Sequence, residues 1–197
     1  MKFLRAGVLA AVISSSLSMT AVARAGEPMA QLSASINEFV LIMANTSVAE
    51  LRATGLPEKA RQLVFARFDF SEMTKQSLGA HWKSLDQGEQ REFVDAFTHR
   101  LLVAYGKTVR STGEEKVEFN REVRDGKQAS VETKVISSNG DQTPIDYRMH
   151  DVNGQWMVYD VSIDKVSMVN NYRAQFARVI AKSSVQDLLR IMKNQES

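Results

Sequence analysis

The chain has 197 residues, no cysteine, and 25 basic against 23 acidic side chains. The lack of cysteine excludes disulfide bonds, thiol catalysis and cysteine-ligated metal sites. This length suffices for one domain that buries roughly 70% of the surface its unfolded chain would expose.

The first 25 residues have the pattern of a secretory signal peptide. Lys2 and Arg5 precede an apolar segment, and Ala-Arg-Ala at 23–25 is a small-x-small cleavage site. The apolar segment is shorter than the ~20 residues of a membrane span. We therefore expect residues 1–25 to be removed and residues 26–197 to form a single exported domain. That domain has 22 basic and 23 acidic residues, so its net charge of −1 gives no reason to expect nucleic-acid binding.

Helical periodicity marks the first half of the predicted domain. A first helix is predicted from apolar residues spaced by three and four, which are Ile36, Phe39, Val40 and Met43. We place its end at Gly55 and Pro57, because these residues disfavour helix continuation. A second helix is predicted for residues 58–67.

Two further helices carry clearer start and stop signals. The third follows Asp69 or Ser71 as N-cap and ends at Gly79. The fourth starts at Asp86, which forms a capping box with Glu89. Its apolar stripe contains unusually large side chains: Phe93, Phe97, Leu101 and Tyr105, widened by Val94 and Leu102.

Beyond residue 113 the apolar period changes to two, which predicts strands. Turn dipeptides at 125–126, 139–140 and 153–154 separate four such segments, so we expect a four-stranded antiparallel meander. The alternating residues are Val117, Phe119, Val123, Val131, Thr133, Val135, Ile145, Tyr147 and Met149.

The fourth strand, residues 156–163, is apolar on both faces and should be covered on both sides. Strict alternation places Trp156 and Val158 on one face, and Met157, Tyr159, Val161 and Ile163 on the other. Two helical stripes follow, separated at residues 183–184. Because helices precede and follow the sheet, the predicted fold class is α+β in one domain.

The sequence offers little catalytic chemistry. His81, His99 and His150 are scattered, and no metalloprotease, P-loop, hydrolase or dinucleotide-binding motif occurs. An enzyme with an isomerase-like cavity would have to use Asp69 or Asp160 as general base. Simpler roles are a helix cap for Asp69, and for Asp160 a partner of backbone groups or of an arginine such as Arg173.

A long signature runs from the fourth strand into the next helix: W-x-V-Y-D-V-x-I-x-x-V-S-x-V-x-N-Y-R-x-Q-F over residues 156–176. With blocks at 68–73, 78–82, 90–105 and 144–148, it resembles the MlaC, or toluene-tolerance, family of periplasmic phospholipid carriers. One departure is Lys165, which stands where relatives commonly have glycine, so the geometry of this turn is in doubt.

The resemblance implies a curved antiparallel sheet and helices, similar to NTF2-like folds, around an apolar cavity for acyl chains. Residues 26–197 then form a single lipid-binding domain, with Lys165 and Arg173 as candidates for the head-group rim. The apolar stripes alone would favour an ordinary core. The candidate lipid-binding residues are Phe93, Phe97, Leu101, Tyr105, Val131, Val135, Tyr147, Met149, Val161, Val169 and Phe176.

The function that the resemblance implies is transport of phospholipid through the periplasm. The partners would be an outer-membrane lipoprotein–porin complex and an inner-membrane MCE-type ABC transporter of a lipid-asymmetry system. We expect a monomer without catalytic residues, metal or cofactor, whose bound phospholipid is cargo. The alternatives are a hopanoid-type carrier, a periplasmic enzyme with an isomerase-like cavity, and a structural adaptor with a filled core.

Overall fold

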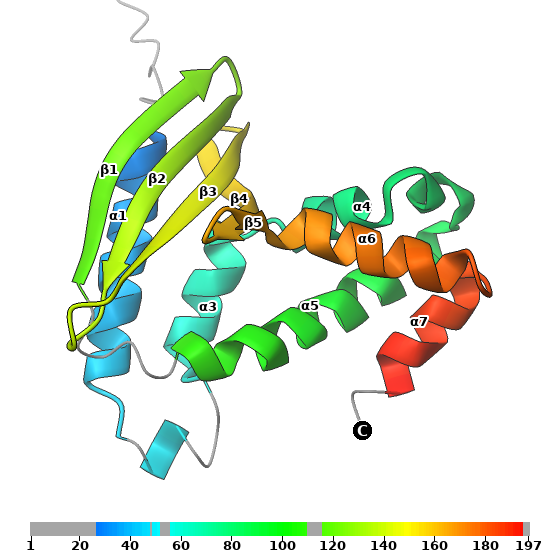
Figure 1. The fold of residues 1–197 in the computed structure, drawn as a ribbon, viewed down its shortest axis with the longest axis horizontal. Helices are drawn as coiled ribbons and strands as arrows, with labels where there is room; N and C mark the ends of the chain where they lie inside the picture. The colour runs from blue at the N-terminus through cyan, green and yellow to red at the C-terminus, as the bar shows by residue number, and fades with distance from the viewer. Residues whose placement is uncertain (1–26, 48, 52–55, 110–115, 195–197) are drawn as a thin grey trace, which may run out of the picture.

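The computed structural model describes residues 27–47, 49–51, 56–109 and 116–194, which form an α+β fold (Figure 1). Its sheet is antiparallel with the strand order β1-β2-β3-β4-β5. The predicted fold class and meander are confirmed, and a two-residue fifth strand is added. The strands are β1 Lys116–Asp125, β2 Gln128–Ile136, β3 Gln142–Val152, β4 Gln155–Ile163 and β5 Val166–Ser167.

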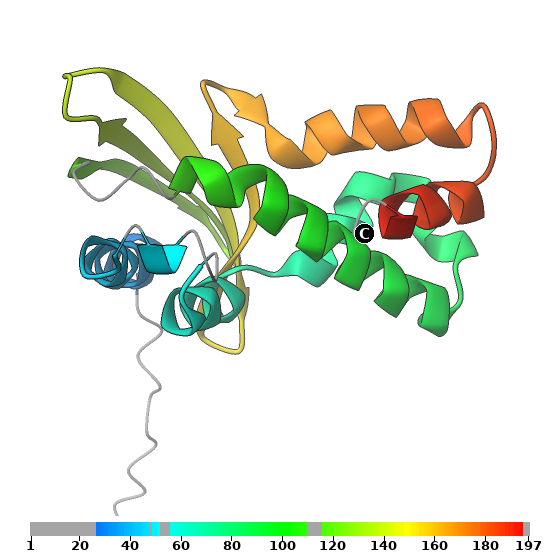
Figure 2. The ribbon, with the colours of Figure 1, turned by 90° about the horizontal axis from the view of Figure 1, so that it is seen from below.

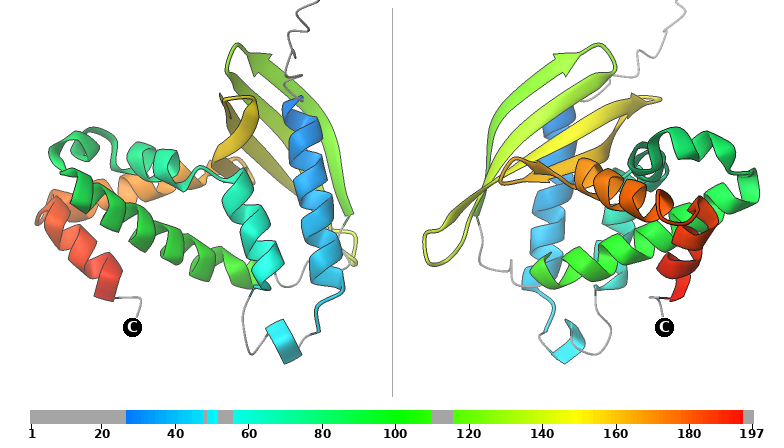
Figure 3. Two further views of the ribbon diagram at one scale, coloured as in Figure 1. Left: turned by 180° about the vertical axis from the view of Figure 1, so that it is seen from behind. Right: turned by 45° about the vertical axis from the view of Figure 1, so that its right-hand side comes forward.

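The helices lie in two groups relative to the sheet. α1 and α3 lie against one face of the curved sheet, and α4 to α7 form a group at its side (Figure 2). Both views in Figure 3 show α1 running alongside the strands. The bounds are α1 Pro28–Ala44, α3 Glu58–Arg67, α4 Phe70–Leu78, the 3-10 helix η1 Gly79–Ser84, α5 Gln87–Val109, α6 Met168–Ile180 and α7 Val185–Asn194.

The predicted start and stop signals of the middle helices are confirmed. α3 spans the predicted residues, and Asp69 caps α4 by accepting a hydrogen bond from the Glu72 amide at 2.9 Å. Gly79 ends α4 with φ +58°, a conformation that glycine adopts without steric cost. At α5, Asp86 and Glu89 form the capping box through bonds of 2.8 and 3.0 Å.

α1 ends much earlier than the sequence predicted. Its last residue is Ala44, and the predicted stop Gly55 lies outside the described residues. The side-chain amide of Asn45 and the hydroxyl of Thr46 donate hydrogen bonds to the carbonyls of Leu41 and Ile42, at 2.8 and 2.7 Å. Such side chains compete with the helical hydrogen bonds, which explains why the helix stops here.

The faces predicted for β4 are wrong beyond residue 159, because the strand contains a β-bulge. Arg148 pairs with Asp160 and Met149 with Val158, so Tyr159 is the extra residue. Beyond it the alternation is inverted, and Val161 packs in the same cluster as Trp156 and Val158. Tyr159 instead joins the core of α4 to α7. The strand is covered on both sides as predicted, but with different residues on each.

A second bulge, in β1, exposes a residue that was expected to face inward. The register shifts between Phe119 and Arg121, after which Glu122 pairs with the buried Val131. Val123 therefore lies 43% exposed. The inward position goes to Glu122, whose carboxylate accepts from the Met29 amide at 2.6 Å.

Two large apolar clusters form the core on either side of β4. One lies between α1 and the sheet and includes Leu32, Val131, Met149 and Trp156, all nearly inaccessible to solvent. The other lies among α4 to α7. It contains Phe93, Phe97, Tyr172, Phe176, Leu188 and Met192.

The buried carboxylate of Asp160 joins β4 to α6. Asp160 is 1% exposed and accepts hydrogen bonds from the Ser167 hydroxyl at 2.6 Å and the Val169 amide at 3.0 Å. Its arginine partner is Arg148, at 3.8 Å, and not Arg173 as the sequence suggested. Arg173 instead donates to the Gln76 carbonyl. The proposed role of Asp160 as a backbone partner is thus confirmed.

The turn between β4 and β5 has the geometry that the sequence left in doubt. Asp164 and Lys165 both adopt positive φ, +49° and +65°. Two consecutive left-handed residues in a two-residue loop form a type I′ hairpin, which matches the twist of the flanking strands. Lys165 therefore occupies a position that glycine would fill with less strain.

Replacing Asp160 by alanine should destabilise the fold. The substitution leaves the Val169 amide and the Ser167 hydroxyl without their acceptor in a buried site, which costs about 1–3 kcal/mol for each group. Urea denaturation measures the loss. The exposed Asp95 on α5 is a control, and Asp95→Ala should change the free energy of unfolding by less than ~0.5 kcal/mol. Equal losses in the two variants would contradict the role assigned to Asp160.

Candidate functional site

An apolar cavity with two adjoining lobes opens between the sheet and the helices. The first lobe lies between α1, α3 and the sheet and has a volume of about 210 Å³. The second lies between α3, α4, α5 and the sheet, with a volume of about 330 Å³. Six residues line both lobes, so the lobes share a wall: Phe39, Val64, Phe68, Val135, Ile145 and Tyr147.

The strand register explains why the sheet presents an apolar surface to this cavity. Val135 pairs with Thr143, Tyr147 with Val161, and Ile145 with Ile163. Paired residues of neighbouring strands point to the same face, so the period of two on each strand adds up to one continuous wall. On the helical side α5 contributes Leu101, Leu102 and Tyr105 to the second lobe, beside residues of α3 and α4.

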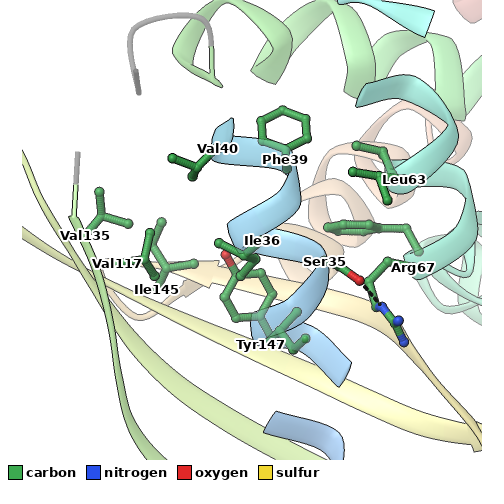
Figure 4. A pocket seen from close by; sticks show the side chains of 13 residues that line it. Ser35, Ile36, Phe39, Val40, Leu63, Arg67, Val117, Val135, Ile145 and Tyr147 are labelled. Atoms are coloured by element: carbon green, nitrogen blue, oxygen red, sulfur yellow. Dashed lines mark hydrogen bonds between the residues drawn. The ribbon is translucent and has the colours of Figure 1, made fainter. Parts of the chain in front are cut away.

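Tyr147 is the central polar group of the cavity. Figure 4 shows its ring beside Ile36 of α1, on the sheet side of the first lobe. Burial raises the pKa of its phenol to about 12. Its hydroxyl has no hydrogen-bond partner among the described residues. A neutral phenol at the shared wall is compatible with an apolar ligand and gives the cavity no charge.

Five of the residues predicted to bind lipid line the cavity. Val135 and Tyr147 belong to both lobes, and Leu101, Tyr105 and Val161 belong to the second. Val161 reaches this position only because of the bulge at Tyr159. Their placement agrees with the predicted role, which itself stays a prediction.

The other six predicted lipid-binding residues lie in packed core and outside the lining of either lobe. Phe93, Phe97, Val169 and Phe176 belong to the core of α4 to α7, where Phe97 packs edge-on against Phe176 at 5.4 Å. Val131 and Met149 are fully buried between the sheet and α1. An apolar stripe looks the same in sequence whether it faces a core or a cavity.

Neither predicted head-group residue lines the cavity. Lys165 is exposed at the β4–β5 turn, two positions from Ile163 and three from Met168, which both line the second lobe. Arg173 is held on the outside of α6 by its bond to the Gln76 carbonyl, at 2.7 Å. Lys165 thus stays near the second lobe, whereas Arg173 links α6 to α4.

Sequence reasoning missed the contribution of α1 and α3. Ile36 and Phe39 belong to the predicted stripe of the first helix, but nothing in that stripe distinguishes a cavity wall from a core. Val64 and Phe68 carry no clear periodic signal. Arg67 was overlooked because a single arginine at the end of a short helix is ordinary in sequence.

The carboxylates that an enzyme would need have structural roles. Asp69 caps α4 and also lies 3.0 Å from His150 Nε2, and Asp160 caps the start of α6. Neither lines a lobe of the cavity. Within the described ranges no three histidine or acidic residues are grouped so that they could hold a metal ion. In the same ranges, none of the helices combines the length and apolar character needed to cross a bilayer.

The chain is an α+β protein in which a curved antiparallel sheet and helices enclose an apolar cavity, the kind of pocket that is the first candidate for a ligand site. The chain belongs to the MlaC family, whose model matches residues 34–194. The matched range includes α3 to α7 and all five strands.

Known proteins resemble this chain at low sequence identity. A phospholipid-binding protein from Ralstonia solanacearum, solved in complex with a phospholipid, superposes with a TM-score of 0.77 at 24% identity, covering 86% of this chain and 96% of its own. The toluene tolerance protein ttg2D of Pseudomonas putida is 26% identical over 48% of this chain. The intermembrane phospholipid transport system binding protein MlaC of Haemophilus influenzae is 23% identical over 61%. This chain spans 45% and 58% of the lengths of these two relatives.

The raised pKa of Tyr147 predicts a late ionisation. Because the folded pKa of about 12 exceeds the ordinary ~10, the contribution of neutral Tyr147 to stability is complete below pH ~10 and is lost as pH rises towards 12. Tyrosinate absorbance measures the ionisation. Tyr147→Phe should remove amplitude only from the phase near pH 12, and amplitude lost near pH 10 would contradict the buried position.

Proposed function

We propose that this chain is a periplasmic phospholipid carrier, and the observation that carries the proposal is its two-lobed apolar cavity. The lining consists almost wholly of aliphatic and aromatic side chains from the sheet and from α1, α3, α4 and α5. Such a surface suits acyl chains. Membership of the MlaC family and the phospholipid complex of the related Ralstonia protein support the same cargo.

The size of the hydrophobic effect explains why a carrier needs this cavity. Each methylene moved out of water contributes about 0.8 kcal/mol, so the ~30 methylenes of two acyl chains represent on the order of 24 kcal/mol. A protein that moves lipid through water must therefore bury nearly all of both tails. The head group is best left near solvent, since burying an unpaired phosphate would be costly.

The cellular setting of the proposal combines the sequence with the family. Residues 1–25 act as a cleaved signal peptide that exports the domain 26–197 to the periplasm. The carrier then exchanges phospholipid between an outer-membrane lipoprotein–porin complex and an inner-membrane MCE-type ABC transporter of an Mla-type system. It works as a monomer. It needs no cofactor, because transfer between two apolar environments makes and breaks no covalent bond.

Lipid bound during expression gives the first test. The protein purified without detergent should carry diacyl phospholipid, detected by native mass spectrometry and by mass spectrometry of a solvent extract. It should also take labelled phospholipid from donor vesicles and deliver it to acceptor vesicles. A protein that is free of lipid and inactive in transfer would overturn the proposal.

A charge placed in the shared wall should empty the cavity. Val135 lines both lobes, so Val135→Arg should reduce phospholipid transfer at least tenfold, because the guanidinium would lie against acyl chains. The matched control is Val123→Arg. Val123 lies on the neighbouring strand with an exposed side chain, and its substitution should leave transfer unchanged.

The two variants also separate a cavity from a filled core. Val135→Arg should keep a cooperative unfolding transition, because its side chain can enter the open space of the cavity. Loss of the folded state in Val135→Arg, together with normal transfer by Val123→Arg, would show that Val135 belongs to ordinary core.

A further inference from the structure

Among the described residues, Arg67 is the one cation in the lining of the cavity. It is the last residue of α3 and lines the first lobe, where α1, α3 and β4 meet. Figure 4 shows its guanidinium beside Ser35, and in this view α1 lies between it and the labelled residues of the sheet. The other described residues that line the two lobes are uncharged.

The hydrogen bonds of Arg67 fix its orientation and leave part of it unused. Its Nε donates to the Ser35 hydroxyl at 2.9 Å, and its Nη1 donates to the Gln31 side-chain oxygen at 3.0 Å and to the Trp156 carbonyl at 2.6 Å. These bonds use three of the five guanidinium N–H groups. The two N–H groups of Nη2 have no acceptor among the described residues.

The positive charge of Arg67 also has no counterion in the part of the chain that the structure describes. Its three acceptors are all neutral, and within the described residues no carboxylate forms an ion pair with it. Burial lowers the pKa of its guanidinium, with no neighbouring anion to compensate. A half-buried arginine with free donors, held rigidly at the wall of an apolar cavity, is arranged to receive an oxyanion.

We propose that Arg67 forms an oxyanion subsite of the cavity, which binds the negatively charged group of an amphiphile whose acyl chain occupies the first lobe. The subsite rests on the proposed lipid-binding function and specifies its cargo further. A carboxylate, as in a fatty acid, and a phosphate, as in a phospholipid, both offer charged oxygen acceptors for the remaining N–H groups of Nη2. The charge of the cargo, and not only its apolar volume, then determines affinity.

This subsite differs from the head-group rim that the sequence suggested. Lys165 and Arg173 both lie outside the lining of the lobes, whereas Arg67 belongs to it. The same bonds also tie α1 and α3 to β4, so Arg67 has a structural role beside the proposed one. A test must therefore measure selectivity for charge as well as stability.

Two matched pairs of ligands test the selectivity in the full mature protein. A polyene fatty acid is compared with its methyl ester, and phosphatidic acid with diacylglycerol of the same chains. We expect the anionic member of at least one pair of ligands to bind about tenfold more tightly. A gain of this size is what a charge-assisted hydrogen bond provides. A preference in the first pair identifies a carboxylate, and a preference in the second a phosphate.

Substitution of Arg67 shows whether the preference originates there. Arg67→Gln keeps a hydrogen-bond donor towards Gln31 and Trp156 but removes the charge, so the anionic and uncharged ligands should bind equally. Arg67→Lys keeps the charge and should retain part of the preference, which provides a second test should the glutamine variant fail to fold. Arg178→Gln, an exposed arginine on α6, is the matched control and should keep the full preference.

The outcomes separate this inference from the proposed function. Equal affinity of the wild type for charged and uncharged ligands, or a preference that persists in Arg67→Gln, would overturn the subsite. Binding of diacylglycerol by the same proteins would still support a lipid-binding cavity. Failure to bind any diacyl lipid would instead overturn the carrier function itself.

Discussion

The bulge at Tyr159 is the constraint on which the two halves of the molecule depend. A regular strand presents its side chains alternately to two faces. One face of β4 must contact α1 and line the cavity, and the other must pack against the helices α4 to α7. The extra residue inverts the alternation partway along the strand. Trp156, Val158 and Val161 can then all face the cluster that packs against α1, while Tyr159 packs among α4 to α7.

Separate cores allow the protein to keep a cavity without losing its fold. A void in a packed interior normally lowers stability, because the residues around it lose contacts. Here the aromatic cluster of Phe93, Phe97, Tyr172 and Phe176 packs outside the lining of the lobes, and Val131, Met149 and Trp156 pack between α1 and the sheet. The lining residues are thus free to serve a ligand. A cargo that fills the lobes would add apolar contacts that the protein alone does not make.

The electrostatics of the cavity follow a similar division. The carboxylates of Asp69 and Asp160 are used at helix starts, where amide groups stabilise their charge. Tyr147 is neutral at ordinary pH, and burial raises its pKa further. Of the described residues in the lining, only Arg67 carries a charge, which makes its guanidinium a candidate determinant of cargo. An apolar cavity with a single oriented cation selects ligands by their ends as well as by their chains.

The sequence by itself determined the local structure: the bounds of α3, the caps at Asp69 and Asp86, the turns between strands, and the α+β order. These depend on neighbouring residues, so short-range patterns suffice. Tertiary structure alone decided which apolar residues line a cavity, because Phe97 and Leu101 share one stripe yet only Leu101 reaches a lobe. It also decided the faces of β4 and the setting of Arg67. Bulges and long-range contacts depend on how separate elements pack, and no periodic pattern in the chain encodes them.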